Sequence, residues 1–278
     1  MMTHAKQQKR ALTVAAGAAR EVGELLRKNL RLSKRINFAE QHDLKIELDV
    51  RSQKIIEKRL QSAFPEVAIL GEEGVVGDTL SENRFVVDPI DGTVNFTYGI
   101  PHACVSIALQ CRGNRAVASA HADAAFKTTM GLVYDPFTDE MFTAIRGQGA
   151  KLNGKAIHVS DRERMDEAIV SIGFAKSKTS LERMLPQFNR LVHKVRKIRI
   201  MGAAALAMVY VAAGRFDAYV EGGVRLWDIA AGGLILEGAG GDFWNEPVAA
   251  DHAYRIIANN GKLRQKLQRI ASSQGVKG

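Results

Sequence analysis

Apolar residues recur along this chain with two different periods, and the alternation between them predicts a protein of mixed helices and strands. Apolar spacings of three and four predict amphipathic helices at 10–30 and 50–64. Short apolar runs predict strands through the rest of the first half, at 67–70, 84–88, 103–111, 115–122, 130–135 and 140–146.

The second half of the chain continues the same mixture. Strands are expected at 168–172, 196–200, 216–221 and 254–258. Helices are expected at 180–194, 203–213, 228–238 and 261–272. The sequence has no Pro-rich or Ser-rich spacer, internal repeat or low-complexity tract, and 278 residues can form one compact unit with two sublobes. We place the boundary near residue 150, which gives an N-terminal lobe at 1–150 and a C-terminal lobe at 151–278.

The charge of the chain is strongly basic: 39 lysines and arginines against 30 acids give a formal net charge of +9. The basic residues gather in three runs, which are Lys6, Lys9 and Arg10; Arg27, Lys28, Arg31, Lys34 and Arg35; and Lys194, Arg196, Lys197 and Arg199. Such runs usually form solvated faces. They could also steer anionic phosphate substrates or bind nucleic acid. With 6% aromatic residues and no RNA-binding motif, little beyond charge supports nucleic-acid recognition.

The sequence indicates a cytoplasmic protein with reduced cysteines. Residues 1–19 lack the continuous apolar core of a secretory signal, and no apolar run reaches the length of a membrane-spanning helix. Cys104 and Cys111 lie seven residues apart in apolar sequence, which fits neither a metal knuckle nor a disulfide framework, so we expect buried thiols. The histidines show no paired ligand spacing, which argues against zinc.

Candidate chemistry begins at residues 86–96, which read Val-Val-Asp-Pro-Ile-Asp-Gly-Thr-Val-Asn-Phe. Asp88 and Asp91 lie three residues apart where an apolar strand is expected to end, because Pro89 prevents its simple continuation. Gly92 permits the close backbone approach that a bound anion requires. Two converging carboxylates repel each other unless a positive charge lies between them, and hard divalent cations take oxygen ligands. Magnesium is therefore the first candidate.

Other acids also stand at the ends of expected elements. Glu72 and Glu73 follow the strand at 67–70, Asp228 precedes a helical stretch, and Asp49 opens another. These acids could share one cleft with the pair at 88 and 91 only if the fold brings the element ends together.

Each acid alone also fits a purely structural role. Asp88 and Asp91 could form an Asx-turn at a strand end. Asp49 and Asp228 could be helix caps, and Glu72 could belong to a solvated turn. Only the combination favours a functional site.

The combination resembles the inositol monophosphatase family. The resemblance rests on GEE at 71–73, DPIDGTVNF at 88–96 and WDIAAGGLILEGAGG at 227–241. It continues in family order through nearly the whole chain, at 147–150, 153–154, 201–204 and 217–221. It implies a mixed α/β fold layered as an α/β/α/β/α sandwich.

The resemblance also implies a magnesium site of two or three ions. Glu72, Asp88 and the backbone carbonyl of Ile90 would hold one ion. Asp88, Asp91 and Asp228 would hold a second, so that Asp88 bridges both. Two such ions activate a water on one side of a phosphorus atom and neutralise the leaving oxygen on the other. The implied activity is that of a phosphoric monoester hydrolase.

Catalytic roles follow from the same resemblance. Thr93 would hydrogen-bond near the attacking water, Glu72 would orient or deprotonate that water, and Asp49 would polarise Thr93 from behind. The backbone N–H groups of Gly92 and Thr93, at the start of an expected helix, would bind the phosphate.

The substrate side of the implied site contains Glu221, Gly202, Ala203 and Asp228. An acid that faces the substrate favours neutral hydroxyl groups and disfavours a second phosphate, so the resemblance implies a small phosphorylated polyol, first an inositol monophosphate. Histidinol phosphate, fructose 1,6-bisphosphate and 3'-phosphoadenosine 5'-phosphate are the alternatives, because the metal motifs are shared.

Two departures from the family pattern bear on these assignments. Residues 43–46 read Asp-Leu-Lys-Ile where the family resembles Asp-Leu-Val-Thr, so Lys45 could replace part of the charge of the weakest, third metal and change the role of Asp49. Ala203 stands where a hydroxyl residue is common, which weakens the choice of a particular polyol.

Other properties are implied by the resemblance alone. They are inhibition by lithium and a homodimer. A different class of function is a phosphatase-fold protein that acts mainly by binding RNA or the transcription machinery through its basic surface.

Overall fold

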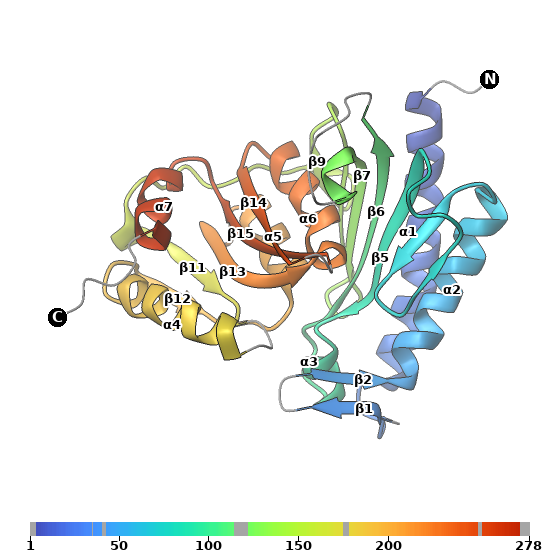
Figure 1. Cartoon of the computed structure of the whole chain (residues 1–278), viewed down its shortest axis with the longest axis horizontal. Coiled ribbons are helices and arrows are strands. Elements are labelled where there is room, and N and C mark those ends of the chain that lie inside the picture. The colour runs from blue at the N-terminus through green and yellow to red at the C-terminus, as the bar shows by residue number, and fades with distance from the viewer. Residues whose placement is uncertain are drawn as a thin grey trace.

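The computed structural model describes residues 4–34, 36–40, 43–113, 122–174, 178–249 and 252–272. Its two large β-sheets are separated by a pair of helices, and a further pair covers the outer face of each of these sheets (Figure 1). This arrangement confirms the layered α/β/α/β/α fold. No helix in the described ranges is long and apolar enough to span a membrane.

The first outer layer consists of α1 (His4–Asn29) and α2 (Glu47–Ala63). Helix α1 contacts β6 and β7, and α2 contacts β5. The side of α1 that faces the sheet is built from small and branched apolar residues at helical spacing, all of them fully buried: Ala11, Ala15, Ala18, Val22 and Leu26.

The first sheet has eight strands in the order β10-β9-β8-β7-β6-β5-β3-β4. Their bounds are β3 (Ala68–Gly71), β4 (Gly74–Val76), β5 (Asn83–Asp91), β6 (Cys104–Arg112), β7 (Phe126–Asp135), β8 (Glu140–Ile145), β9 (Ala150–Leu152) and β10 (Lys155–Ala156). Among the strands described in this sheet, only β3 and β5 pair in parallel. The carboxyl ends of these two strands therefore meet at one edge of the sheet.

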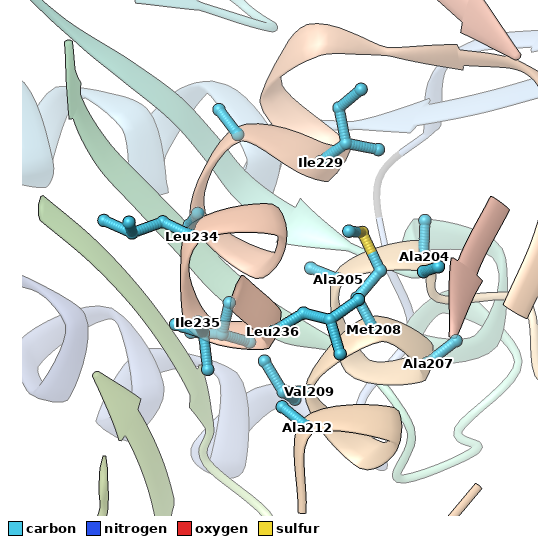
Figure 2. Packing of buried hydrophobic residues seen from close by; sticks show 14 of the residues in the cluster. Ala204, Ala205, Ala207, Met208, Val209, Ala212, Ile229, Leu234, Ile235 and Leu236 are labelled. Atoms are coloured by element: carbon cyan, nitrogen blue, oxygen red, sulfur yellow. The ribbon is translucent and has the colours of Figure 1, made fainter. Parts of the chain in front are cut away.

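The central layer is formed by α5 (Ala204–Ala212) and α6 (Leu226–Gly238), which are apolar around nearly their whole circumference. Figure 2 shows side chains of the two helices meeting between them, among them Met208 and Leu236, whereas Leu234 points away from α5. Glycine permits this approach, because a Cβ at Gly232 would lie 3.0 Å from the Cβ of Met208. A helix that is apolar on every side must be covered on every side, and the two sheets supply that cover.

The second sheet has five strands in the order β12-β11-β13-β15-β14. Their bounds are β11 (Ile169–Ile172), β12 (Lys197–Arg199), β13 (Ala218–Arg225), β14 (Asp242–Ala249) and β15 (Ala253–Asn259). Helices α4 (Lys178–Val192) and α7 (Arg264–Ser272) contact this sheet from outside. The smaller elements are the hairpin of β1 (Ile36–Glu40) and β2 (Asp43–Ile46), the short helix α3 (Thr93–Thr97), and the 3-10 turns η1 (Ala122–Ala125) and η2 (Met165–Glu167).

Several predicted boundaries are corrected by the structure. Strand β5 continues past Pro89 to Asp91, with a shift of register between Asp88 and Asp91 that accommodates the proline. Helix α6 begins at Leu226, so Asp228 lies within its first turn. The strand predicted at 115–122 falls almost entirely outside the described residues, and Ala122 itself belongs to η1.

The boundary predicted near residue 150 stays a prediction. One apolar cluster crosses it, since the residues packed around α5 and α6 run from Leu70 to Ala258. The predicted burial of both cysteines is correct for Cys104 and wrong for Cys111, which is half-buried, and both thiols are free.

Candidate active site

The last residues of β5 carry two buried carboxylates. Asp88 is 1% exposed and Asp91 is 7% exposed. The Oδ1 atom of Asp88 accepts a hydrogen bond of 2.9 Å from the N–H of Ile90. Burial of two acids so close together is costly unless hydrogen bonds or a cation compensate it.

Asp91 joins β5 to the central helix layer. Its Oδ1 accepts from the N–H of Ala204 at 3.1 Å, and its Oδ2 accepts from the N–H of Ala205 at 2.7 Å. These N–H groups belong to the first turn of α5 and have no partner within the helix. The start of the helix therefore favours a negative charge beside it. The thiol of Cys104 lies 3.5 Å from the same Oδ2.

Gly92 follows Asp91 in a conformation that only glycine adopts easily, with φ of +91°. A Cβ at this position would lie 2.8 Å from the carbonyl oxygen of His102 and 3.2 Å from the Cβ of Ala203. The 92–93 turn is therefore packed directly against the segment that precedes α5.

Asn95 fixes that packing. Its Nδ2 donates to the carbonyl oxygens of His102, at 3.0 Å, and of Met201, at 2.8 Å. A Cβ at Gly202 would lie 3.2 Å from the same Nδ2. Gly202 and Ala203, predicted to bind substrate, are thus held beside Gly92 and Thr93.

Asp49 lies in the first turn of α2 and faces Thr93. Its Oδ2 accepts from the N–H of Ile46 at 2.8 Å, and its Oδ1 lies 3.4 Å from the hydroxyl oxygen of Thr93. The same hydroxyl lies 2.8 Å from the carbonyl oxygen of Ile90. Asp49 therefore combines the cap role and the contact with Thr93 that the sequence left as alternatives.

Glu72 comes directly after β3, and its N–H donates to the carbonyl oxygen of Val87 at 3.1 Å. The turn around it is attached to α2 by Gln53, whose Oε1 accepts from the N–H of Glu73 at 2.8 Å. The Nε2 of Gln53 donates to the carbonyl oxygen of Gly74 at 3.2 Å. The parallel pairing of β3 and β5 brings Glu72 to the end of the sheet where Asp88 lies.

Asp228 occupies the third position of α6 and accepts a hydrogen bond from the N–H of Arg225 at 2.8 Å. The preceding carbonyl, of Trp227, accepts from the hydroxyl of Ser106 at 3.0 Å. Ser106 pairs with Asp88 across β5 and β6. The first turn of α6 is thereby tied to the strand beside Asp88.

The carboxylates perturb one another. Burial, followed by the charges of Glu72, Asp91 and Asp228, raises the pKa of Asp88 well above its ordinary value. Burial raises the pKa of Asp91 to about 7, with Glu72 adding to the shift and the N–H groups of α5 opposing it. Burial also raises the pKa of Asp49 to about 7, and the charge of Glu72 contributes.

The chemistry of these residues fits a hard divalent cation. The charged neighbours that raise the pKa values of Asp49, Asp88 and Asp91 are all carboxylates. Oxygen is the ligand atom that magnesium prefers. Within the described ranges, no three acidic, imidazole or thiol side chains are gathered closely enough to hold an ion as they lie. Several carboxylate oxygens accept backbone N–H bonds instead. The assignment of individual metal ligands therefore stays a prediction.

Metal-free protein is expected to lose stability as the pH rises from about 4 to about 7. The folded-state pKa of Asp49 and of Asp91 lies above the ordinary 3.8, so the folded protein holds more protons than the unfolded chain across this window. Thermal unfolding in chelator should give a melting temperature several degrees lower at pH 7.5 than at pH 5. Asp49→Asn should flatten this slope. A melting temperature that rises steadily from pH 5 to 7.5 would contradict the prediction.

Glu221 stands on β13, and the hydroxyl of Tyr219 donates to its Oε2. Burial and Glu221 raise the pKa of Tyr219 well above its ordinary value, and the charges of Asp91 and Asp228 add to this shift. The Glu221 carboxylate packs against Gly173, where a Cβ would lie 1.6 Å from Oε2, so a larger residue at 173 would displace the carboxylate. Glu221 thus lies near the acids of β5 and α6.

The structure places Thr93 against Asp49 and Ile90, and it brings Glu72, Asp91 and Asp228 close enough to Asp88 to shift its pKa. Glu221 is connected to these acids through Tyr219. The predicted residues lie on the following elements: Asp49 on α2, Glu72 after β3, Asp88, Ile90 and Asp91 on β5, Gly92 and Thr93 at α3, Gly202 and Ala203 before α5, Glu221 on β13 and Asp228 on α6. Their assigned roles stay predictions.

Sequence reasoning missed the residues that hold this site in place, namely Gln53, Asn95, Ser106 and Tyr219. Asn95 stands inside the motif at 88–96 and could have been considered there. Tyr219 likewise stands inside the stretch at 217–221, two residues from Glu221. Gln53 and Ser106 act through contacts distant in sequence, which no local pattern indicates.

Known proteins share this architecture and this sequence. The chain matches the Inositol monophosphatase family over residues 7–274. It is 34% identical to Nus factor SuhB of Xylella fastidiosa over 279 residues, which cover 96% of each chain. It is 36% identical to inositol monophosphatase 2 of Solanum lycopersicum over 264 residues, covering 90% of this chain and 94% of that one.

Solved structures agree with these matches. The extragenic suppressor protein SuhB of Bartonella henselae superposes with a TM-score of 0.83 at 33% identity, covering 96% of this chain and 100% of that one. An IMPase from Thermotoga maritima gives a TM-score of 0.79 at 29% identity, covering 94% and 96%. The layered fold, the order of the motifs and these whole-chain matches show that the chain belongs to the inositol monophosphatase family.

Proposed function

We propose that this protein is a magnesium-dependent phosphomonoesterase that acts on a small phosphorylated polyol, first an inositol monophosphate. The observation that carries the proposal is the buried carboxylate of Asp88, which is perturbed by Glu72, Asp91 and Asp228 from three other positions in the fold. A related structure, SaIMPase-II, at 26% identity and a TM-score of 0.73, contains bound inositol monophosphate. Family membership and this cluster support the same class of reaction.

The ligand set follows the family pattern. Glu72, Asp88 and the carbonyl of Ile90 would hold one magnesium, and Asp88, Asp91 and Asp228 a second, with a third position near Asp49 left open. When bound, the ions would lower the pKa of a water molecule and offset charge on the phosphate oxygens.

Thr93 and Asp49 would orient the water and move its proton. A hydroxyl has one proton and two lone pairs, so while the Thr93 hydroxyl donates to Asp49 or to Ile90 it can still accept from a water. The water oxygen forms a bond to phosphorus as the bond to the polyol oxygen breaks. The proton released by the water passes to Asp49 through Thr93, or to Glu72, and the polyol oxygen takes up a proton.

Backbone groups and one acid would recognise the substrate. The N–H groups of Gly92 and Thr93 would donate to the phosphate. Glu221, held by Tyr219, would accept from substrate hydroxyls, while Gly202 and Ala203 line the same space. A carboxylate at that position repels a second phosphate group, which favours a monophosphate over a bisphosphate.

The test is phosphate release, with and without magnesium, from inositol 1-phosphate, histidinol phosphate, fructose 1,6-bisphosphate and 3'-phosphoadenosine 5'-phosphate. We expect inositol 1-phosphate to be hydrolysed with the highest kcat/KM. Glu221→Gln should raise the KM for that ester by about tenfold, the effect of one charged hydrogen bond, and change turnover of p-nitrophenyl phosphate little. Absence of turnover of every ester by folded, magnesium-loaded protein would contradict the proposal.

The second candidate is a binding role. Three relatives named Nus factor SuhB, from Xylella fastidiosa, Pasteurella multocida and Pseudomonas aeruginosa, are 34–39% identical to this chain, and the name points to the transcription machinery. Basic side chains of Arg164, Lys194, Lys266 and Arg269 line one surface hollow of about 540 Å³. Salt-sensitive RNA binding that survives Asp91→Asn, without any phosphatase activity, would favour this function.

Three further properties stay predictions from family membership. They are inhibition by lithium, assembly as a homodimer, and location in the cytoplasm.

A further inference from the structure

A buried ionic cluster joins the two sheets outside the proposed ligand set. Arg84 on β5 is 1% exposed and donates to Asp123 of η1, with Nη2 and Oδ1 2.7 Å apart. The Asp123 side chain is 7% exposed, and its Oδ2 lies 2.6 Å from Nδ1 of His252 and 2.9 Å from the hydroxyl of Tyr254. The guanidinium belongs to the first sheet, whereas Tyr254 is on β15 of the second.

The Arg84 side of the cluster is rigidly held. Its Nε donates to Oε1 of Gln110 at 2.9 Å, and its guanidinium lies 3.9 Å from the ring centre of Phe126. Burial alone would raise the pKa of Asp123, but the hydrogen bonds from His252 and Arg84 and the charge of Arg84 lower it to about 2. Asp123 is therefore ionised and can only accept, so Nδ1 of His252 carries a proton.

The His252 side of the cluster reaches the first turn of α6. The carbonyl oxygen of His252 accepts from the N–H of Leu226 at 2.9 Å. Its ring centre lies 6.2 Å from that of Trp227. His252 adopts a φ of +62°, which is uncommon for residues other than glycine, and these contacts hold its backbone in that conformation.

These contacts connect β5 to the first turn of α6, which carries Asp228. Arg84 stands four residues before Asp88 on the same strand, and its bridge through Asp123 and His252 ends next to Asp228. Ser106 on β6, which pairs with Asp88, forms a shorter connection to the same turn of α6. The first turn of α6 is thus attached to β5 by two independent routes.

We propose that Asp123 and His252 are positioning residues, which set the place of the Asp228 carboxylate relative to Asp88 and Asp91 and thereby the affinity of the site for magnesium. The proposal rests on the proposed function. Residues that orient metal ligands from outside the ligand set commonly change metal affinity by ten- to a hundredfold when replaced.

The most direct test compares His252→Asn with His252→Asp. Asparagine and aspartate have the same shape, and both tolerate a positive φ better than most residues. The Nδ2 of asparagine takes the place of the imidazole Nδ1 and can donate to Asp123, whereas aspartate presents a second carboxylate to it. The pair therefore differs in the contact that the proposal invokes and in one negative charge, and His252→Gly, which removes the donor without adding charge, controls for the latter.

The first measurement is the magnesium dissociation constant of chelator-treated protein, by titration calorimetry. We expect His252→Asp to weaken binding by about tenfold or more and His252→Asn to stay close to the wild type. Fluorescence of the metal-free protein should change in His252→Asp, because Trp227 lies against the substituted residue.

A second readout separates positioning from general damage. The magnesium dependence of hydrolysis should move to higher concentration in His252→Asp, while kcat at saturating magnesium returns to the wild-type value, since all ligands are still present. Tyr254→Phe removes the other hydrogen bond to Asp123 but leaves the contacts of His252 to Leu226 and Trp227 unchanged, and it should bind magnesium like the wild type.

The remaining outcomes decide the question. Equal weakening in both His252 variants, or none in either, would overturn the proposal. If His252→Asp does not fold, His252→Gly serves instead, because it removes the donor to Asp123 without adding charge. Wild-type affinity of that variant for magnesium would also overturn the proposal. Unchanged magnesium binding in Asp91→Asn would instead count against the proposed function.

Discussion

Replacement of Asp91 by asparagine is expected to reduce kcat/KM for magnesium-dependent phosphate release by about a thousandfold or more. The substitution removes one negative charge from the proposed second metal position, and several kcal/mol of charge stabilisation corresponds to a rate factor of about this size. It also disturbs α5, because both Asp91 oxygens accept N–H bonds from Ala204 and Ala205, and an amide offers only one oxygen.

The control for this effect is Asp135→Asn. Asp135 is also buried, and its Oδ1 accepts from the N–H of Phe137 at 2.8 Å, but it is the last residue of β7 and is not one of the predicted site residues. The Asp135→Asn variant should be less stable than the wild type but should keep the wild-type catalytic rate. Calorimetry would show magnesium binding weakened only in Asp91→Asn. Residual activity above about a tenth of the wild type would contradict the assignment of Asp91, since one lost ligand charge must be worth more than 1.4 kcal/mol.

Replacement of Gly92 by alanine is expected to destabilise the fold by about 3 kcal/mol and to abolish hydrolysis. The side chain would be strained by the φ of +91° and would also meet the carbonyl oxygen of His102 at 2.8 Å. Backbone strain and overpacking each cost about 1–3 kcal/mol. The backbone between Asp91 and Thr93 would have to move, and the proposed ligand and the proposed phosphate donors would move with it.

Gly147→Ala is the matched control for Gly92→Ala. Gly147 has a φ of +80°, but a Cβ there would meet no atom within 4 Å, so only the strain of the backbone conformation, about 1 kcal/mol, remains. Chemical unfolding of metal-free protein at 25 °C measures both free energies. Equal losses in the two variants would show that the contact with His102 and Ala203 contributes nothing.

Local sequence patterns predict the elements of this fold well because most of them bury one apolar face. The spacing of Ala11, Ala15, Ala18, Val22 and Leu26 defines α1 without any tertiary information. Strand β14 was missed, since Pro247 and the polar residues around it do not form a strand pattern, and its pairing with β15 supplies the order that propensity lacks.

The motifs predict which residues form the candidate site, but they do not predict how these residues contact one another. The sequence indicates acids at the ends of elements, but not that Asp91 caps α5 or that Ser106 reaches Trp227, because these contacts join residues more than 110 positions apart. Asp228 and Asp49 were weighed as helix caps or as site residues, and the structure shows that each occupies a first helical turn and lies beside the acid cluster as well. A cap and a metal ligand use the same type of side chain, so local sequence could not separate the two.

The central position of α6 has a consequence for biosynthesis. This helix is apolar on all sides, and the second sheet that covers it is completed only when β15 pairs with β13. During translation β15 leaves the ribosome only after α5 and α6 have already emerged. Until then the nascent chain exposes an uncovered apolar helix pair and an open strand edge, two features that promote aggregation. Chains truncated before residue 253 are therefore expected to depend on chaperones and to be degraded, even though they contain every residue of the proposed site.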